Sequence, residues 1–303
     1  MSDARTELTN LIAHELAQPT ASAVRAMADA VRARYSGAAL AVLFYGSCLR
    51  KPDSLLADSL LDFYLVVDDY RSAYGSGLFA VANQVLPPNV FYLEHQHDGT
   101  TLRAKYAVIS LAQFQQGMSP ASDNVSLWAR FSQPSRAVWV RDPQIKDAIA
   151  GACADAVLTM LGSVAPLMSG DATAETIWRR ALEETYRAEL RSESPARAAE
   201  LVAADVERYR RAAALAGPEM ASAHGTPREC AAAWRRRRRV SKLLNLARLV
   251  KATFTFEGAL DYVLWKVRRH SGVVLPVSDW QRRHPLLAAP VLAWRLYRRG
   301  AFR

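Results

Sequence analysis

The sequence predicts an α+β fold, in which a small mixed sheet is followed by a mainly α-helical region with a basic C-terminal helix. Two observations lead to this prediction. In the first third of the chain, apolar runs of strand length alternate with helical segments in the order helix, strand, strand, helix, strand, strand. From about residue 111 onward, apolar residues recur every three or four positions, which is typical of helices.

The elements of the predicted sheet region follow from local patterns. The first helix is expected over residues 20–35, with Thr20 as its N-cap. The apolar runs that follow are nearly continuous, as in strands that are buried on both faces. A further helix is expected at 71–86, although Gly75 and Gly77 weaken it. Strands are predicted at residues 38–46, 60–68, 87–96 and 103–110.

The rest of the chain reads as helices joined by short connections. The best loop candidate is the segment 216–229, because a Gly-Pro pair opens it and Gly225 and Pro227 follow near its end. We expect three parts in the chain, with boundaries at 1–120, 121–285 and 286–303. Helices are predicted at residues 144–161, 173–190, 196–216, 238–256 and 257–270.

Composition limits the class of protein. The chain has 303 residues, half of them hydrophobic, which suffices for one large or two smaller domains. Its three cysteines are widely spaced, which fits a reducing compartment and argues against a disulfide framework. The N-terminus lacks the apolar core of a secretory signal. The apolar run at 286–294 has about half the length that crosses a bilayer, so we expect a soluble or peripheral protein.

The formal net charge of +10 is concentrated in the C-terminal third, which includes five consecutive arginines at 235–239. Such a region favours an anionic partner. Nucleic acid, an anionic lipid surface and nucleotide phosphates all qualify at this point.

One constellation near the N-terminus can carry chemistry. Gly46 and Ser47 end the first predicted strand, and Asp62 stands inside the apolar run of the second. A glycine turn lets the backbone approach a phosphate, and the serine hydroxyl and amides can donate to its oxygens. A carboxylate on the neighbouring strand can hold a divalent ion against those oxygens, which would offset the cost of placing a charge among apolar residues.

These parts resemble the nucleotidyltransferase superfamily that includes DNA polymerase β. Its signature has a second acid two positions after the first, where this chain has Tyr64. Over about residues 40–115 the chain is similar to one branch, the phosphatidate cytidylyltransferases of the mitochondrial translocator assembly and maintenance type and their bacterial relatives. Cys48 and Ala107 stand where that family often has glycine. The matching segments are Tyr45-Gly46-Ser47, Leu61-Asp62-Phe63, Asn89-Val90-Phe91-Tyr92 and Lys105-Tyr106-Ala107-Val108.

The resemblance implies a nucleotidyltransferase domain at 1–120 that converts CTP and phosphatidic acid into CDP-diacylglycerol and pyrophosphate. It implies that Tyr45, Gly46 and Ser47 bind the nucleotide, and that Asp62 is catalytic and ligates Mg²⁺. A second acid is needed, and we expect Glu94 in this role, because its strand can neighbour the strand of Asp62. Asp68 and Asp69 are the alternatives. Lys105 is expected to pair with phosphates as a second catalytic residue.

A lipid substrate requires access to a bilayer, and the tail 286–303 is amphipathic and basic. Trp294, Arg295, Arg298 and Arg299 are expected to contact an anionic membrane surface. Packing of the apolar side of this tail on the protein core is the alternative.

We therefore expect a cytoplasmic protein that is peripheral on the inner face of the cell membrane. No nucleic acid partner is expected, because the basic runs contain few aromatic residues for base stacking. Two other functions stay open from the sequence. One is nucleotidyl transfer to RNA or a small acceptor, and the other is nucleotide binding without catalysis.

Overall fold

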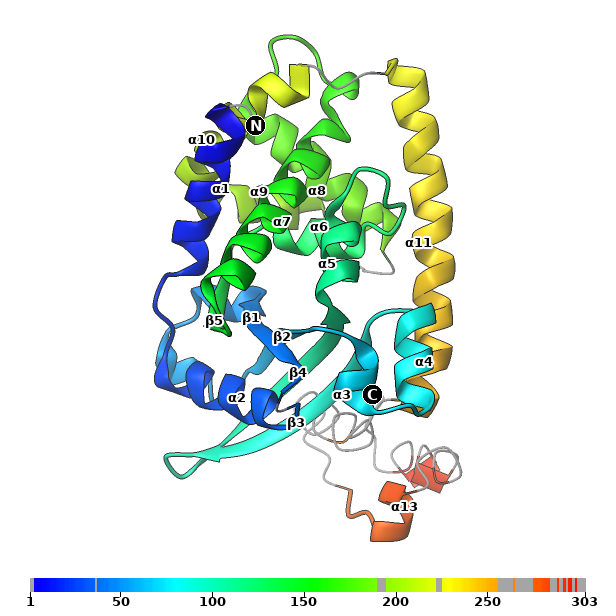
Figure 1. Cartoon of the computed structure of the whole chain (residues 1–303). Coiled ribbons are helices and arrows are strands. Elements are labelled where there is room, and N and C mark those ends of the chain that lie inside the picture. Colours follow the sequence, from blue (N-terminus) through cyan, green and yellow to red (C-terminus); the bar gives the residue numbers. More distant parts are fainter. Residues whose placement is uncertain are drawn as a thin grey trace.

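The computed structural model of the protein describes residues 3–35, 37–189, 195–221, 225–255 and 275–283, and the single positions 264, 288, 291, 292, 294, 295 and 298. Within this part of the chain, one mixed sheet lies beside a larger helical region, and the long helix α11 runs along the side of both (Figure 1). The α+β fold predicted from the sequence is confirmed. The predicted helix at 257–270 lies outside the described residues, apart from position 264.

The apolar runs of the first third of the chain form most of the sheet. Its order is β3–β4–β2–β1–β5, in which β2 and β4 are parallel and the other pairs are antiparallel. The central strands β1 and β2 are buried along almost their whole length, as their continuous apolar runs predicted. The strands are β1 Ala39–Tyr45, β2 Leu60–Val67, β3 Asn89–His97, β4 Thr100–Ser110 and β5 Ser135–Val140.

The strand β5 was not predicted, because the region after residue 120 was expected to be mainly helical. It pairs with β1 at the edge of the sheet, so the sheet takes a strand from the segment expected to be helical. The segment Ser135–Val140 is short and only half-buried, and it carries a polar residue, Arg136, near its start. A run this short gives no clear periodicity, and its pairing with a distant strand decides its conformation.

Helices cover both faces of the sheet. On one face, Val24, Met27 and Val31 of α2 pack against the apolar side chains of β1, β2 and β4. The cap predicted for this helix is wrong, because Ala21 occupies the N-cap position and makes no side-chain bond, while the carbonyl of Thr20 accepts a hydrogen bond from Arg25.

The opposite face of the sheet shares one hydrophobic core with the helical region. Side chains of β2 and β4 such as Val66 and Ile109 lie in the same cluster as Phe114 of α5, Trp128 of α6 and Ile149 of α7. The helices are α1 Asp3–Leu16, α2 Ser22–Ala33, α3 Tyr70–Tyr74, α4 Leu78–Val85, α5 Leu111–Met118, α6 Ser126–Phe131, α7 Pro143–Gly162, α8 Ala174–Ala188, α9 Pro195–Ala203, α10 Val206–Ala221, α11 Pro227–Thr255 and α13 Asp279–Arg283, with 3₁₀ turns η1 Ser47–Arg50, η2 Asp53–Leu55 and η3 Ala165–Leu167.

Two connections differ from their predictions. The helix expected at 71–86 is divided into α3 and α4, because Gly75 adopts a positive φ of 72° and ends α3. The loop expected at 216–229 begins late, since α10 continues through Pro218 to Ala221. Tertiary packing of α10 against α1 and α7 outweighs the helix-breaking tendency of the proline at this position.

The central helix α7 is apolar enough to raise the question of membrane insertion. The segment Pro143–Leu167 has a mean hydropathy of 1.7 in its most apolar window. Most of that window is buried inside the protein, and α7 contacts α1, α6 and α10. These contacts are those of a core helix, so length and composition are weak support for a membrane span here.

A buried ion pair connects helices α1 and α10 and also contacts the end of α6. Arg208 of α10 donates from Nε and Nη2 to the carboxylate of Glu15 in α1, at 2.9 and 3.2 Å. Its Nη1 also donates to the carbonyl oxygen of Ser132, at 2.8 Å, directly after α6. Arg208 therefore fixes the position of α6 relative to α1 and α10.

We predict that Arg208→Met lowers the free energy of unfolding by about 3–5 kcal/mol, because it leaves the carboxylate of Glu15 buried without its partner. Arg197→Met is the matched control, since the pair between Arg197 and Glu200 is exposed and its loss should cost about 0.5 kcal/mol or less. Urea denaturation measures both values. A loss below about 1 kcal/mol for Arg208→Met would contradict a structural role for this pair.

Candidate functional site

The sheet brings the two predicted catalytic residues together. Asp62 in β2 and Lys105 in β4 are register partners on adjacent parallel strands. Lys105 Nζ lies 3.2 Å from Asp62 Oδ1, and the two side chains are 37% and 26% exposed. This contact is an ion pair without a hydrogen bond, since Asp62 Oδ1 is buried and has no hydrogen-bond donor among the described residues. Lys105 therefore balances the charge of this carboxylate without forming a hydrogen bond to it.

The predicted phosphate-binding turn lies against the same carboxylate. Tyr45, the last residue of β1, is the register partner of Asp62, and Gly46 follows it with a φ of +91°. A Cβ added at Gly46 would stand 3.5 Å from Asp62 Oδ2. The 3₁₀ turn η1 starts at Ser47, and the amide of Leu49 donates to the carbonyl of Gly46 at 3.2 Å. Glycine therefore provides both the backbone conformation and the open space beside Asp62.

Aromatic rings border the carboxylate on the face of the sheet that the helical region covers. The rings of Tyr45 and Tyr64 lie 5.4 Å apart, and each contacts Phe131 of α6. Tyr64 stands where the nucleotidyltransferase signature has its second acid. Here its ring is buried and packs on Phe131, so this position contributes to the wall of the site and supplies no metal ligand.

Sequence reasoning missed one cation near this site, Arg130 of α6. Arg130 donates from Nη1 to the carbonyl of Ser126 and to Glu189 Oε1, the latter at 3.3 Å. Burial by itself would lower the pKa of Arg130, but the Glu189 carboxylate together with Tyr64, Tyr45 and Asp62 outweighs this effect, so that the pKa is raised. A fixed guanidinium therefore lies within electrostatic reach of Asp62.

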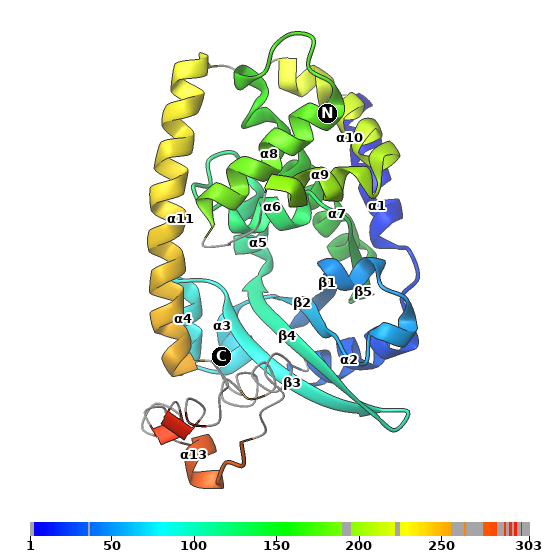
Figure 2. The same ribbon diagram turned by 180° about the vertical axis from the view of Figure 1, so that it is seen from behind.

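The long helix α11 carries two further cations, which lie at the start of β3, nearer the Val67 end of β2 than Asp62. Arg248 donates from Nε to the carbonyl of Pro87 at 2.8 Å, and Lys251 donates to the carbonyls of Leu86 and Pro88. Both side chains thereby hold α11 against the start of β3. Figures 1 and 2 show the lower half of α11 beside α4, which precedes β3. Burial lowers the pKa of Arg248, and the charge of Arg130 lowers it further. Burial, followed by the charge of Arg248, lowers the pKa of Lys251 to about 8.

The candidates for a second acid are not brought to Asp62. Asp68 and Asp69 follow the opposite end of β2, roughly 20 Å from Asp62 along the strand. The expectation that β3 neighbours β2 is wrong, because β4 lies between them, which places Glu94 roughly 10 Å or more from Asp62. Glu94 is held by its own partners, since its Oε1 accepts a hydrogen bond from Tyr92 at 2.8 Å and pairs with Arg103 Nε at 3.2 Å.

The donor set decides which kind of metal site is possible. Among the described residues, no group of three His, Cys, Asp or Glu side chains could enclose a metal ion. The carboxylate of Asp62, whose Oδ2 lies nearest the bend at Gly46, suits a Mg²⁺ ion that arrives with a nucleotide. Mg²⁺ commonly takes one or two protein carboxylates and completes its shell with phosphate oxygens and water. Mg²⁺ binding at Asp62 stays a prediction.

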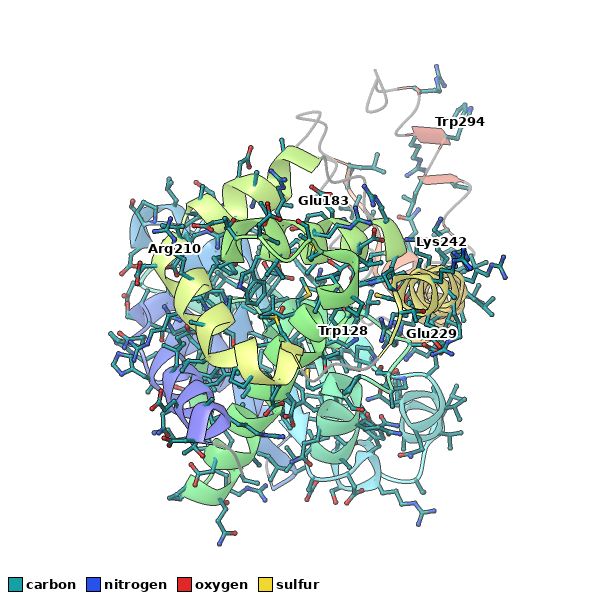
Figure 3. All side chains as sticks on the ribbon, turned by 90° about the horizontal axis from the view of Figure 1, so that it is seen from above. Trp128, Glu183, Arg210, Glu229, Lys242 and Trp294 are labelled. Atoms are coloured by element: carbon teal, nitrogen blue, oxygen red, sulfur yellow. The ribbon has the colours of Figure 1, made fainter. Side chains whose placement is uncertain are left out.

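In the basic tail, some apolar side chains are buried, whereas the tryptophan and the described arginines are exposed. Ala288 and Leu292 are buried in a small cluster with Leu275. Trp294, with Arg298 stacked 4.9 Å above its ring, is exposed at the edge of the molecule (Figure 3). Arg295 is also exposed, and Arg299 lies outside the described residues. Membrane contact by these side chains stays a prediction.

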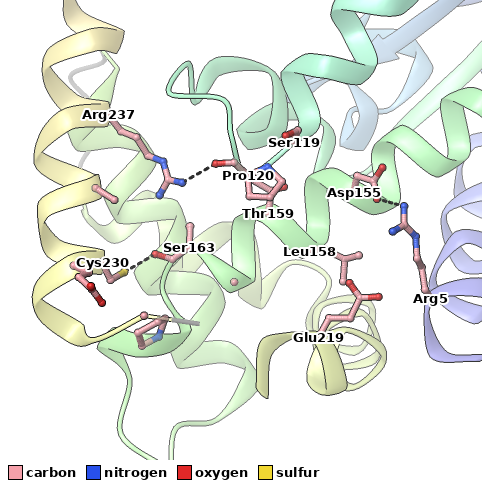
Figure 4. A pocket seen from close by; sticks show the side chains of 15 residues that line it. Arg5, Ser119, Pro120, Asp155, Leu158, Thr159, Ser163, Glu219, Cys230 and Arg237 are labelled. Atoms are coloured by element: carbon pink, nitrogen blue, oxygen red, sulfur yellow. Dashed lines mark hydrogen bonds and ion pairs between the residues drawn. The ribbon is translucent and has the colours of Figure 1, made fainter. Parts of the chain in front are cut away.

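A separate cavity of about 630 Å³ lies in the helical region (Figure 4). It is lined by the ion pair of Arg5 and Asp155, by Glu219, and by Arg237, which donates to the carbonyl of Pro120 at 3.2 Å. None of the predicted site residues contributes to its wall. We therefore treat this cavity as distinct from the site around Asp62.

Comparison with known proteins adds little to the functional assignment of this site. No protein-family model matches the sequence, and no curated protein matches it either. Among solved structures, the chain is similar to a nucleotidyltransferase-like protein from Exiguobacterium sibiricum 255-15, with 10% sequence identity over 66% of this chain and 78% of that chain. The TM-score of 0.28 is too low to carry an argument, so the assignment of the site depends on the contacts described above.

We predict that Gly46→Ala weakens CTP binding about tenfold or more, because the new Cβ occupies the space beside Asp62 that a phosphate needs. Gly37→Ala is the matched control, since Gly37 has the same φ of +91° with open space around it. Both variants should lose about 1–3 kcal/mol of stability through backbone strain. Calorimetric titration with CTP separates the two effects, and equal affinities in the two variants would exclude the bend at Gly46 as the binding site.

We also predict a pH-dependent contribution from Lys251. Its pKa is about 8 in the folded protein and about 10.5 in an unfolded chain, so the unfolded state binds more protons between these values. The stability of the wild type relative to Lys251→Met should therefore rise as the pH increases from 8 to 10.5. Urea denaturation of both proteins at several pH values measures this difference, and a constant difference would refute the burial of this amine.

Proposed function

We propose that this protein is a nucleotidyltransferase that transfers the cytidylyl group of CTP to phosphatidic acid, forming CDP-diacylglycerol and releasing pyrophosphate. The observation that carries the proposal is the contact of Gly46, at positive φ, with the carboxylate of Asp62, which is itself paired with Lys105. A glycine bend, a carboxylate and a cation on adjacent strands are the parts that nucleotidyl transfer requires.

The residues have separate tasks in the proposed reaction. The bend at Gly46 and Ser47 receives the triphosphate through backbone amides and the serine hydroxyl. Lys105, now paired with Asp62, turns to the phosphates when a nucleotide occupies the bend. Arg130 stays in place because Glu189 and the Ser126 carbonyl hold it, and its positive charge stabilises the charge that accumulates on the phosphates.

The chemical step is an in-line displacement at phosphorus. A phosphatidate oxygen attacks the α-phosphorus of CTP, the new P–O bond forms, and the bond to the bridging oxygen breaks so that pyrophosphate leaves. A bound Mg²⁺ would supply Lewis-acid neutralisation of the phosphate oxygens. The protein itself aligns the two reactants and supplies fixed charges, and no covalent intermediate is needed.

Support for a lipid acceptor comes from the sequence resemblance and from the basic C-terminal third of the chain. Two alternatives remain in view. Transfer to RNA or to a small acceptor would use the same bend and carboxylate. Nucleotide binding without catalysis is favoured by one observation, since Asp62 is the one carboxylate that the described chain places at the bend.

One assay separates these functions. Purified protein is incubated with labelled CTP, Mg²⁺ and phosphatidate, and a parallel tube contains RNA. We predict that label appears in the lipid-soluble fraction only. Label in RNA alone would support the first alternative, and nucleotide binding without any transfer would support the second.

In the same assay, we predict that Asp62→Asn reduces transfer by about a hundredfold or more, because the amide has no charge with which to hold a cation at the phosphates. Asp68→Asn, at the far end of the same strand, is the matched control and should keep full activity. Circular dichroism and thermal unfolding verify that both variants fold. Full activity of Asp62→Asn would remove this residue from the mechanism.

A further inference from the structure

Two neighbouring helices expose large apolar side chains in regular rows. These side chains are between 54% and 78% exposed, and they make up six of the ten large hydrophobic side chains that are exposed among the described residues. They are Leu78, Val81 and Val85 of α4 and Leu243, Leu246 and Val250 of α11. On each helix the spacing is i, i+3, i+7, which places the three side chains in one stripe along one face.

The two helices lie side by side. Arg248 and Lys251 of α11 donate to the carbonyls of residues 86–88, which directly follow α4. Both views of the ribbon show α4 beside the C-terminal half of α11 (Figures 1 and 2). Large apolar side chains that cluster on an exposed surface mark a site of interaction.

The stripe on α11 continues as a row of cations toward the N-terminus of the helix. Arg228, Arg235, Arg239 and Lys242 fall on the same face as Leu246, at spacings of seven, four, three and four residues along the helix, and all four are exposed. Within the described part of the chain, none of the four has an ion-pair partner. Figure 3 shows Lys242 at the rim of the molecule, away from Trp128 in the core.

We propose that this surface, the exposed face of α11 together with the stripe on α4, docks on an anionic lipid bilayer. A helix with apolar and cationic residues on its outer face lies in the membrane interface, where the apolar side chains enter the boundary between headgroups and acyl chains. Unpaired arginines and lysines near the surface attract anionic headgroups. Nucleic acid would match the cations but leave the leucines and valines unused, and few aromatic residues accompany them for base stacking.

The same helix connects the docking surface to the candidate active site. Leu246 and Val250 point outward from α11, whereas Arg248 between them is directed inward to Pro87 and lies near Tyr64 and Arg130. Docking of α11 thus brings the site beside the bilayer, where a lipid phosphate is found. This inference rests on the proposed function only for the identity of the substrate, since membrane docking itself requires no nucleotide.

Vesicle flotation of the full-length protein tests the surface. We expect binding to vesicles of phosphatidylcholine with one fifth phosphatidate or phosphatidylglycerol, and little binding to phosphatidylcholine alone. Leu243→Gln/Leu246→Gln/Val250→Gln should lower the fraction bound at least about tenfold. Arg235→Gln/Arg239→Gln/Lys242→Gln should lower it about a hundredfold at low salt. The control Arg25→Gln/Lys146→Gln/Arg211→Gln removes three exposed charges elsewhere and should change it little.

Unchanged flotation of the apolar triple variant, with its fold verified by thermal unfolding, would overturn the proposal. If the wild type sediments as a dimer and the apolar triple variant as a monomer, the proposal is also overturned, in favour of a second copy on this face.

An assay of transfer to a short-chain, water-soluble phosphatidate distinguishes docking from catalysis. The apolar variant should keep this activity. If the wild type binds vesicles normally but shows no transfer, the proposed function is refuted and the proposed docking surface is not.

Discussion

The parallel pairing of β2 with β4 is the constraint on which the site depends. It sets Asp62 and Lys105 at the same level on adjacent strands, and their ion pair offsets the cost of a carboxylate in an apolar strand. The antiparallel pairing of β1 with β2 then brings the bend at Gly46 to the same carboxylate. A shift of either register by one residue would turn Asp62 away from its partners and toward the opposite face.

The helical region completes the site by adding charge from one side. Arg130 of α6 is held by Glu189 and acts electrostatically on Asp62, whereas Arg248 and Lys251 of α11 bind the carbonyls that precede β3, nearer the other end of β2. The fixed charge of Arg130, together with that of Lys105, favours an anionic ligand at the glycine bend, such as a nucleotide. Because α11 also presents an apolar and basic outer face, one helix can connect a phosphate site with a lipid surface.

The sequence predicted those features that depend on local pattern. The continuous apolar runs gave β1 and β2, and the glycine and the aspartate at their ends marked the bend and the carboxylate. The strand β5 was missed because its conformation depends on pairing with β1, far away in the chain. Arg130 was missed for a similar reason, since nothing in the segment around it distinguishes it from a surface arginine until the fold buries it beside Glu189. Glu94 was placed too close to Asp62 because strand order cannot be derived from one sequence.

The central claim is that a nucleotide lies across the bend at Gly46 with Asp62 directed at its phosphates. A crystal structure of the protein with CTP and Mg²⁺ tests it most directly. The account predicts the triphosphate on the amides of Gly46 and Ser47, the metal ion on Asp62, and Lys105 moved from the carboxylate to a phosphate oxygen. A nucleotide bound in the helical cavity near Arg237, with the pair of Asp62 and Lys105 still closed, would contradict it.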